Sequence, residues 1–485
     1  MRALYNFLSA SGAWRMDGRR RANRRGRERS PSGRRSCPNG TRGPLWAVNS
    51  SDQPIDTDAT RVQSMDPSAP SGAFRPGQYI RPELVRMQPY VPILPYEVLA
   101  RQLGRDPADI VKLDANENPY GPAPGVFQAL ASAPFLHIYP DPESTELRQA
   151  LADFTGAPIE HLMVGHGADE LIDLVFRLLI EPGKQQRIVN APPTFGMYPF
   201  DADVNGAVVC TVWRREADGY RFPVEEVEAL FADGDKVVNG SLSGGPRVIF
   251  VASPNNPDGS VLSDADLRRL LALPAVVVLD EAYAEFVDSE DTIDGAMLTD
   301  DAPVYSRIQW VQEHRNLIVL RTFSKWAGLA GLRVGYGAFP LELIEQLWKI
   351  KQPYNVNAAG QIAAKVSLSE RADLFHKVAR LKAERARFFQ VMAERHASWM
   401  RLYPSQSNFV LCRVLRHPRP ESSLGTDAGS SAPARALRDF LRDRGILIRY
   451  YSSPGLEDCI RVSMGTPAQM DRLYTALDEF LDGGD

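Results

Sequence analysis

The sequence predicts an α/β protein built on a mostly parallel sheet. Beyond Asn116, short apolar runs that indicate buried strands alternate with segments whose apolar residues recur with the period of a helix. Polar or turn-forming residues bound each run, as is typical of strands that are buried on both faces. The 485 residues suffice for one large globular unit of two or three subdomains, and no internal repeat is found.

The expected elements follow in chain order. A short helix is predicted over residues 95–103 and a short strand over 110–113. Residues 170–180 place Leu171, Leu174, Val175 and Leu178 on one face of a helix. Buried strands are predicted over residues 247–253, Val276–Asp280, 317–321 and 334–339, followed by a long charged helix over 379–395. Two segments rich in glycine and serine, 239–245 and 422–432, predict surface loops.

Charge is distributed unevenly along the chain. The first 50 residues hold twelve arginines, no lysine and two acids, a local charge of +10. Because the whole chain carries −4, the other 435 residues carry −14. An acidic body argues against a nucleic-acid-binding protein, because phosphate contacts need a basic face.

Residues 1–71 predict a disordered basic extension, because their composition offers too little apolar surface to fold. The composition fits an organelle transit peptide, and the charge fits a nucleic-acid tail, although no helix-turn-helix pattern accompanies it. The interpretation favoured here is that translation begins near Met65. The expected location is then cytoplasmic, with the plastid stroma as the alternative if the segment is a transit peptide.

The cysteines and histidines indicate no metal site. Four scattered cysteines without a CxxC pair exclude a disulfide framework and a standard zinc site, and the seven histidines lack ligand spacing. A reducing compartment is therefore the default expectation. No run reaches the roughly 18 apolar residues that a membrane helix needs.

The loop RTFSKWAGLAGLR, residues 321–333, directly follows a predicted strand. Open α/β sheets bind ligands at the carboxyl ends of their strands. Ser324 and Arg333 can hold a phosphate there while Lys325 reaches an aldehyde, provided that desolvation or nearby charge keeps the amine nucleophilic. Taken alone, the pattern fits an ordinary lysine beside a helix equally well.

Further polar residues also follow predicted strands. Asp280 ends the run VVVLD, where a carboxylate can hold a pyridine nitrogen protonated, although a turn cap is the simpler interpretation of Asp280 alone. Tyr283 and Asn256 can each donate a hydrogen bond to a phenolate-like ring oxygen. The loop GHGADE opens the helix at 170–180 and suits a phosphate, while its His166 is expected to be a plain loop residue.

Together these stretches resemble the fold type I aminotransferases that depend on pyridoxal phosphate and, among them, the histidinol-phosphate aminotransferases. The similarity extends from about Tyr79 to Phe480. It is carried by DANENPYGPAP, IYPDPES, GADELID, APPTFGMY, SPNNPDG, VVLDEAY, RTFSKWAGLAGLRVGYG and KQPYNV, in the order and spacing of the family. The resemblance implies an N-terminal arm (72–112), a three-layer α/β/α cofactor domain (113–350) and a smaller α+β domain (351–485).

The resemblance also implies a role for each site residue. Lys325 would bind the cofactor aldehyde, Asp280 the pyridine nitrogen, and Tyr283 with Asn256 the ring oxygen. Phe195 would stack on the ring, although a core phenylalanine is the usual interpretation of such a residue. The cofactor phosphate would meet Ser324, Arg333 and the backbone of Ala168 and Asp169. Tyr139 would reach the phosphate of the neighbouring subunit, so a homodimer is expected, whereas His166 and Trp326 fall at variable positions.

For the substrate, the resemblance implies Arg461 and Arg449. Two guanidinium groups suit a phosphate dianion, and Arg461 would also accept the carboxylate of 2-oxoglutarate. The alternative for Arg449 is a surface ion pair. Asn355 and Asn118 are expected to line the pocket, and Tyr90 to contact the substrate, with nearby Tyr96 as an alternative.

The implied activity is transamination of L-histidinol phosphate with 2-oxoglutarate in histidine biosynthesis, giving imidazole acetol phosphate and glutamate. The alternatives are an aromatic amino acid aminotransferase and an amino-acid-phosphate decarboxylase of the same branch. From a different class, the chain would be a cofactor-binding regulator whose Arg-rich head touches DNA. The expected partners are small molecules and a second copy of the chain, with no nucleic acid and no membrane.

Overall fold

The computed structural model describes residues 76–482, except 88, 90–95, 233–235, 239–240, 244, 289–303 and 416–432. The predicted extension 1–71, Tyr90 and the predicted loop 422–432 lie outside the described residues. Among the described helices, none is both long and apolar enough to cross a membrane.

The larger sheet has seven strands in the order β2-β10-β9-β8-β7-β3-β4. β4, β3, β7, β8 and β9 run parallel, and β10 is antiparallel to both of its neighbours. The mostly parallel sheet that the sequence predicts is thus confirmed. The strands are β2 (Leu162–Gly165), β3 (Arg187–Asn190), β4 (Val208–Thr211), β7 (Val248–Ala252), β8 (Val276–Asp280), β9 (Leu317–Thr322) and β10 (Gly335–Ala338).

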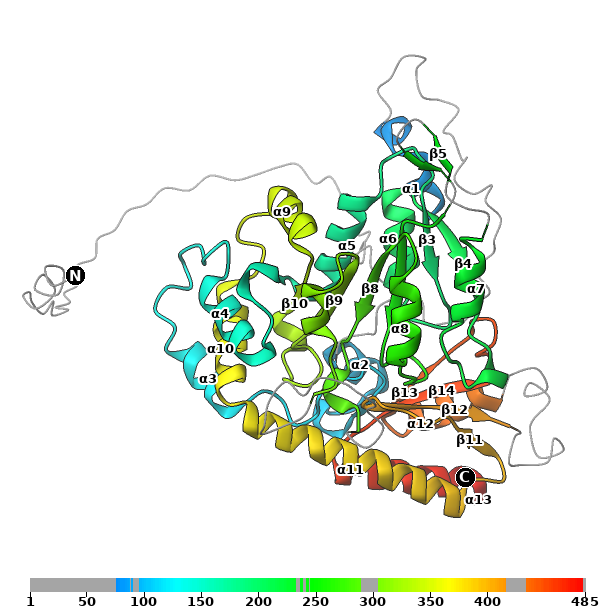
Figure 1. Cartoon of the computed structure of the whole chain (residues 1–485). Helices are drawn as coiled ribbons and strands as arrows, with labels where there is room; N and C mark the ends of the chain where they lie inside the picture. The colour runs from blue at the N-terminus through cyan, green and yellow to red at the C-terminus, as the bar shows by residue number, and fades with distance from the viewer. Residues whose placement is uncertain are drawn as a thin grey trace, which may run out of the picture. The chain divides into compact units, whose positions relative to one another are not determined.

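Helices cover both faces of this sheet, because successive strand residues point to opposite sides (Figure 1). Val248 and Phe250 pack in one apolar cluster with residues of α5 (Gly167–Leu179), α6 (Met197–Asn205) and α9 (Leu341–Ile350). Ile249 and Val251 belong to the main core, which includes residues of α4 (Thr145–Thr155), α7 (Val224–Ala229) and α8 (Asp264–Leu271). The result is the α/β/α layering.

The smaller sheet has five strands in the order β1-β13-β14-β12-β11. They are β1 (Val111–Leu113), β11 (Met400–Leu402), β12 (Phe409–Val414), β13 (Ile446–Tyr450) and β14 (Cys459–Ser463). β1 pairs with β13 in parallel, so a strand from the segment assigned to the N-terminal arm joins the C-terminal sheet. The remaining pairs are antiparallel. Three helices pack in the same apolar core as this sheet: α11 (Arg371–Arg395), α12 (Pro433–Asp443) and α13 (Pro467–Asp482).

Two predicted elements differ from the structure. The long charged helix α11 begins at Arg371 rather than 379, because Leu374 and Val378 continue its buried face toward the N-terminus. In the segment predicted as the loop 239–245, β6 (Ser241–Ser243) pairs with β5 (Lys236–Val238) as an antiparallel ribbon. The other helices are α1 (Pro82–Arg86), α2 (Tyr96–Leu103), α3 (Pro124–Ala131) and α10 (Ala358–Ser369).

Candidate active site

A cavity of about 420 Å³ lies beyond the carboxyl ends of β7, β8 and β9. Residues of the larger sheet and of β13 and β14 line it, so both sheets contribute to one site. Eleven of the predicted site residues line this cavity: Ala168, Asp169, Phe195, Asn256, Asp280, Tyr283, Ser324, Lys325, Arg333, Arg449 and Arg461.

Lys325 stands at the turn that follows β9. Thr322 shapes the turn, since its hydroxyl donates to Ser324 Oγ at 2.9 Å and accepts from the Ser324 backbone N–H at 3.1 Å. The ammonium group donates to the carbonyl of Ala115 at 3.3 Å and lies 5.9 Å from the centre of the Tyr283 ring. Burial, with the Arg461 charge as the next cause, lowers the pKa of Lys325 to about 8. Burial therefore increases the neutral, nucleophilic fraction of the amine near neutral pH.

Asp280 is buried at the end of β8, with 6% of its surface exposed. Its Oδ2 accepts a hydrogen bond from the Tyr198 hydroxyl at 2.7 Å, and its Oδ1 accepts one from the Ala282 backbone N–H at 3.0 Å. Burial raises its pKa to about 6, although the Tyr198 bond acts in the opposite direction. Within the described part of the chain, no cationic side chain bonds to this carboxylate, so the site favours a protonated nitrogen beside it.

The two predicted ring-oxygen donors have fixed orientations. Asn116 Nδ2 donates to the Tyr283 hydroxyl at 2.9 Å. Arg461 donates through Nη1 to Asn256 Oδ1 and through Nη2 to the Asp114 carbonyl at 2.6 Å. Because its oxygen faces Arg461, the amide of Asn256 keeps its N–H groups for another acceptor.

The N-terminus of α5 and Arg333 form a tight cradle. Arg333 Nη2 pairs with Asp169 Oδ2 at 2.7 Å, and α5 has no side-chain cap. Gly167 has a φ of +75°, and a Cβ there would lie 2.5 Å from Arg333 Nη2. A Cβ on Gly335 would lie 2.4 Å from the backbone N of Ala168. The uncapped N–H groups of this helix start, next to a guanidinium, suit a phosphate.

The other predicted residues lie elsewhere. Neither Asn118 nor Asn355 lines the cavity. The amide of Asn118 donates to the Trp326 carbonyl at 2.9 Å, and that of Asn355 donates to Glu170 Oε2 at 2.7 Å. Tyr139 is 78% exposed and stacks on Tyr354. Tyr96 donates to the Ile110 carbonyl at 3.3 Å, away from the cavity.

Sequence reasoning missed several residues of the site. Asn116 and Tyr198 contact Tyr283 and Asp280, while Glu117 and Tyr451 line the cavity. Asn116 and Tyr198 stand in DANENPY and APPTFGMY, two of the stretches that carry the family resemblance. Their roles depend on contacts between distant segments, which a local pattern does not reveal.

Comparison with known proteins identifies the family. The model of the aminotransferase class I and II family matches residues 108–477. The chain is 46% identical over 402 residues to histidinol-phosphate aminotransferase 1, chloroplastic, of Arabidopsis thaliana, covering 83% of this chain and 86% of that protein. This chain belongs to the histidinol-phosphate aminotransferases. Its identity to the Roseiflexus castenholzii histidinol-phosphate aminotransferase is 45%, covering 82% of this chain and 97% of the relative.

A solved structure of the same family supports the fold. The histidinol-phosphate aminotransferase of Sinorhizobium meliloti, in complex with pyridoxal-5'-phosphate, matches with a TM-score of 0.68 and 28% identity, covering 85% of this chain and 99% of that one. The family's cofactor is pyridoxal phosphate, and the cavity fits it. The buried Asp280 has no cationic partner among the described residues, Ala168, Ser324 and Arg333 line the cavity at the uncapped start of α5, and the Lys325 amine is partly neutral.

Proposed function

We propose that this histidinol-phosphate aminotransferase transfers the amino group of L-histidinol phosphate to 2-oxoglutarate, giving imidazole acetol phosphate and glutamate. The observation that carries the proposal is the pairing of Arg449 with Arg461 in neighbouring strands β13 and β14. Residues directly opposite each other in an antiparallel pair point to the same face, and two like charges there are destabilising. A dianion between them removes this cost.

Both guanidinium groups have unused donors. The Nε of Arg461 is buried without a hydrogen-bond partner. The Arg449 guanidinium lines the cavity and makes no hydrogen bond or ion pair with any described residue. A phosphate monoester is a dianion that two arginines bind in bidentate fashion, which supports histidinol phosphate over an amino acid with a single carboxylate.

Lys325 carries the proton transfer in this proposal. Bound pyridoxal phosphate supplies the electron sink that stabilises negative charge at the substrate carbon. The neutral Lys325 amine removes the proton from the substrate carbon that bears the nitrogen, and its lowered pKa keeps it available for that step. Asp280 holds the proton on the pyridine nitrogen, while Tyr283 and Asn256 donate to the ring oxygen.

A direct assay tests the substrate. Purified holoenzyme is incubated with histidinol phosphate and 2-oxoglutarate, and glutamate is measured with phenylalanine as competitor. We expect glutamate to form with little inhibition by phenylalanine. Strong preference for phenylalanine would identify an aromatic aminotransferase, and release of carbon dioxide would identify a decarboxylase.

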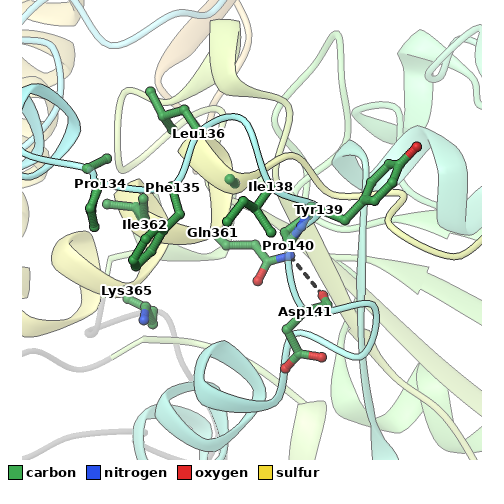
Figure 2. Close-up of a pocket in the computed structure, with 12 residues that line it drawn as sticks. Pro134, Phe135, Leu136, Ile138, Tyr139, Pro140, Asp141, Gln361, Ile362 and Lys365 are labelled. Atoms are coloured by element: carbon green, nitrogen blue, oxygen red, sulfur yellow. Dashed lines mark hydrogen bonds between the residues drawn. The ribbon is translucent and has the colours of Figure 1, made fainter. Parts of the chain in front are cut away.

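The proposed enzyme is a homodimer. Apolar side chains that precede α4 are exposed: Phe135 (64%), Leu136 (58%), Ile138 (52%) and Tyr139 (78%). They border a second cavity with Ile362 of α10, where Gln361 donates to the Asp141 carbonyl at 3.1 Å (Figure 2). Figure 2 shows Tyr139 directed away from Phe135 and Ile362. A second copy would cover this face and receive Tyr139 at its cofactor phosphate.

Sedimentation of the purified protein tests the dimer. A mass twice that of the chain is expected, together with weaker cofactor affinity in Tyr139→Phe. A monomer with full activity would contradict the composite site. Phe127→Ser, at another exposed aromatic residue, should change neither the mass nor the cofactor affinity.

The plastid is the proposed location. The Arg- and Ser-rich composition of residues 1–71 and the word chloroplastic in the name of the Arabidopsis thaliana relative support the transit-peptide interpretation. Mass spectrometry of the natural N-terminus tests it. A mature start near residue 71 is expected, whereas an initiator methionine at Met65 would favour the cytoplasm.

A further inference from the structure

Asn116 lies at the junction of the two sheets. It follows β1 of the smaller sheet by three residues, and its side chain contacts Tyr283, which follows β8 of the larger sheet by three residues. Only 2% of its surface is exposed, and its φ is +57°. This left-handed conformation, which asparagine tolerates better than most residues, turns the side chain from one sheet toward the other.

Hydrogen bonds from the smaller sheet fix its orientation. The Asn116 backbone N–H donates to Ser463 Oγ at 3.0 Å, and the Ser463 hydroxyl donates to Asn116 Oδ1 at 2.8 Å. Asn408 Nδ2 donates to the Asn116 carbonyl at 3.1 Å. Because the side-chain oxygen accepts from Ser463, the NH₂ group must face Tyr283.

This orientation decides the role of the Tyr283 hydroxyl. An amide NH₂ group only donates, so the phenolic oxygen accepts at 2.9 Å and must direct its own proton elsewhere. Among the described residues, no acceptor for that proton is found. Tyr283 lines the cavity, so its proton is available to an acceptor inside it.

We infer that Asn116 is a positioning residue that turns the Tyr283 hydroxyl toward the cofactor's ring oxygen and couples this hydrogen bond to the position of the smaller sheet. Ser463 lies two residues after Arg461 on β14, so the strand that offers an arginine to the substrate also holds Asn116. A shift of β14 on anion binding would therefore move Ser463 and Asn116 and change the hydrogen bond from Tyr283 to the ring oxygen. The inference rests on the proposed function, because it requires the cofactor in this cavity.

The test is a pH titration of the visible absorbance of the cofactor-bound protein. A hydroxyl that donates to the ring oxygen lowers its basicity, so its loss raises the pKa of the absorbance change. Tyr283→Phe should raise this pKa by about one unit, the effect of one hydrogen bond to a charged group. Asn116→Asp keeps the shape and the φ preference but replaces the donor with an acceptor. The Tyr283 hydroxyl would then donate to the new carboxylate at position 116 instead of to the ring oxygen, so the absorbance pKa should rise at least as far as in Tyr283→Phe.

A double variant separates orientation from charge. The charged groups around Tyr283 are Lys325, Asp280, Asp169 and Arg461, and all remain in each variant. Asn116→Gly, which is uncharged and tolerates positive φ, should also raise the pKa. If Asn116 acts through Tyr283, Asn116→Gly adds no shift in the Tyr283→Phe background, whereas any shift that Asn116→Asp adds there measures the new charge alone. An additional shift from Asn116→Gly in that background would show an effect independent of the Tyr283 hydroxyl and would overturn the inference.

Asn316→Asp is the matched control. Asn316 precedes β9 at the opposite end of the larger sheet, and its amide donates to the carbonyls of Leu271, Leu273 and Ala275. This variant should lower stability without moving the absorbance pKa. A shift in Tyr283→Phe but not in either Asn116 variant overturns the inference and leaves the proposed function intact. No shift in Tyr283→Phe overturns the inference and the assignment of Tyr283 together, whereas failure of the transamination assay alone concerns the substrate.

Discussion

The hydroxyl of Tyr198, in α6, donates a hydrogen bond to Oδ2 of Asp280, at the end of β8, at 2.7 Å. Tyr198 is fully buried between Phe195 and Phe250, so the bond is shielded from water. It favours the ionised form of a carboxylate whose pKa burial raises. The site thus keeps Asp280 ionisable without giving it a permanent cationic partner, which leaves that place for the ring nitrogen.

Tyr198→Phe should therefore reduce turnover most strongly at low pH. Losing a donor to the charged carboxylate raises the pKa of Asp280 and lowers kcat roughly tenfold, since such a bond contributes about 1.5 kcal/mol or more. A pH profile of kcat checks this. Tyr336→Phe removes a hydroxyl that is buried without a partner, so it should leave the profile unchanged. Superimposable profiles for Tyr198→Phe and wild type would contradict the role of the bond.

Asp280→Asn should stabilise the protein in its cofactor-free form while abolishing most turnover. Because burial raises the pKa from 3.8 to about 6, the fold favours the protonated acid. The protonated acid therefore contributes fully to the free energy of unfolding below about pH 4. This contribution is lost as the pH rises through about 6, and the total loss in the free energy of unfolding is then about 3 kcal/mol. The gain from Asp280→Asn is smaller than this difference, because the new NH₂ group must face another donor. Urea unfolding at several pH values would contradict this if the wild-type pH dependence persisted in the variant.

Lys325→Ala should prevent covalent attachment of pyridoxal phosphate. Borohydride reduction followed by peptide mass analysis should place the adduct on Lys325 in the wild type and find none in the variant. Turnover should fall by about 10⁴-fold or more, as expected for loss of both nucleophile and base. In the wild type, the rate of cofactor capture should rise as the pH passes about 8, since only the neutral amine attacks. Lys377→Ala, at a lysine paired with Asp373, should retain the adduct.

Arg449→Ala should separate phosphate substrates from amino acids. Removing one guanidinium should lower kcat/KM for histidinol phosphate by about 10- to 100-fold, the range for a hydrogen bond to a charged group. The activity with phenylalanine should change far less. Arg401→Ala removes a surface arginine of β11 that pairs with Glu216 and serves as the comparison. Equal losses for both substrates would assign Arg449 a structural role.

The sequence predicted the parts of the site that local patterns encode. Lys325 with Ser324, and Asp280 with Tyr283, follow apolar strands, and parallel topology brings such loops to one edge of a sheet. Asn118 and Asn355 were expected to line the pocket, but their amides bond to structural partners. A polar residue in a recognisable stretch does not reveal which way its side chain turns.

The contacts between the two sheets could not be predicted either, because they join segments that are distant in the sequence. The parallel pairing of β1 with β13 joins residues more than 300 positions apart, and it places Asn116 beside Ser463. The Arg449–Arg461 juxtaposition depends on the register of β13 and β14, where a slip of one residue would turn one arginine to the other face. Short strands such as these carry no signal for register.

The buried ion pair of Arg321 and Glu285 provides the last prediction. Arg321 lies four residues before Lys325, and its Nη2 lies 2.6 Å from Glu285 Oε1, with at most 1% of either side chain exposed. Glu285→Ala leaves the guanidinium with Glu281 as its remaining carboxylate neighbour and should destabilise the fold by about 3 kcal/mol. Arg321→Met combined with Glu285→Leu should recover part of that loss, because Glu281 keeps the Arg307 charge and its hydrogen bonds from Ser306 and the Arg307 backbone N–H. Urea unfolding measures both, with the exposed Glu342→Ala, which breaks a surface pair with Arg315, expected to change little. A loss in Glu285→Ala no larger than that of Glu342→Ala would show that Arg321 does not depend on this partner.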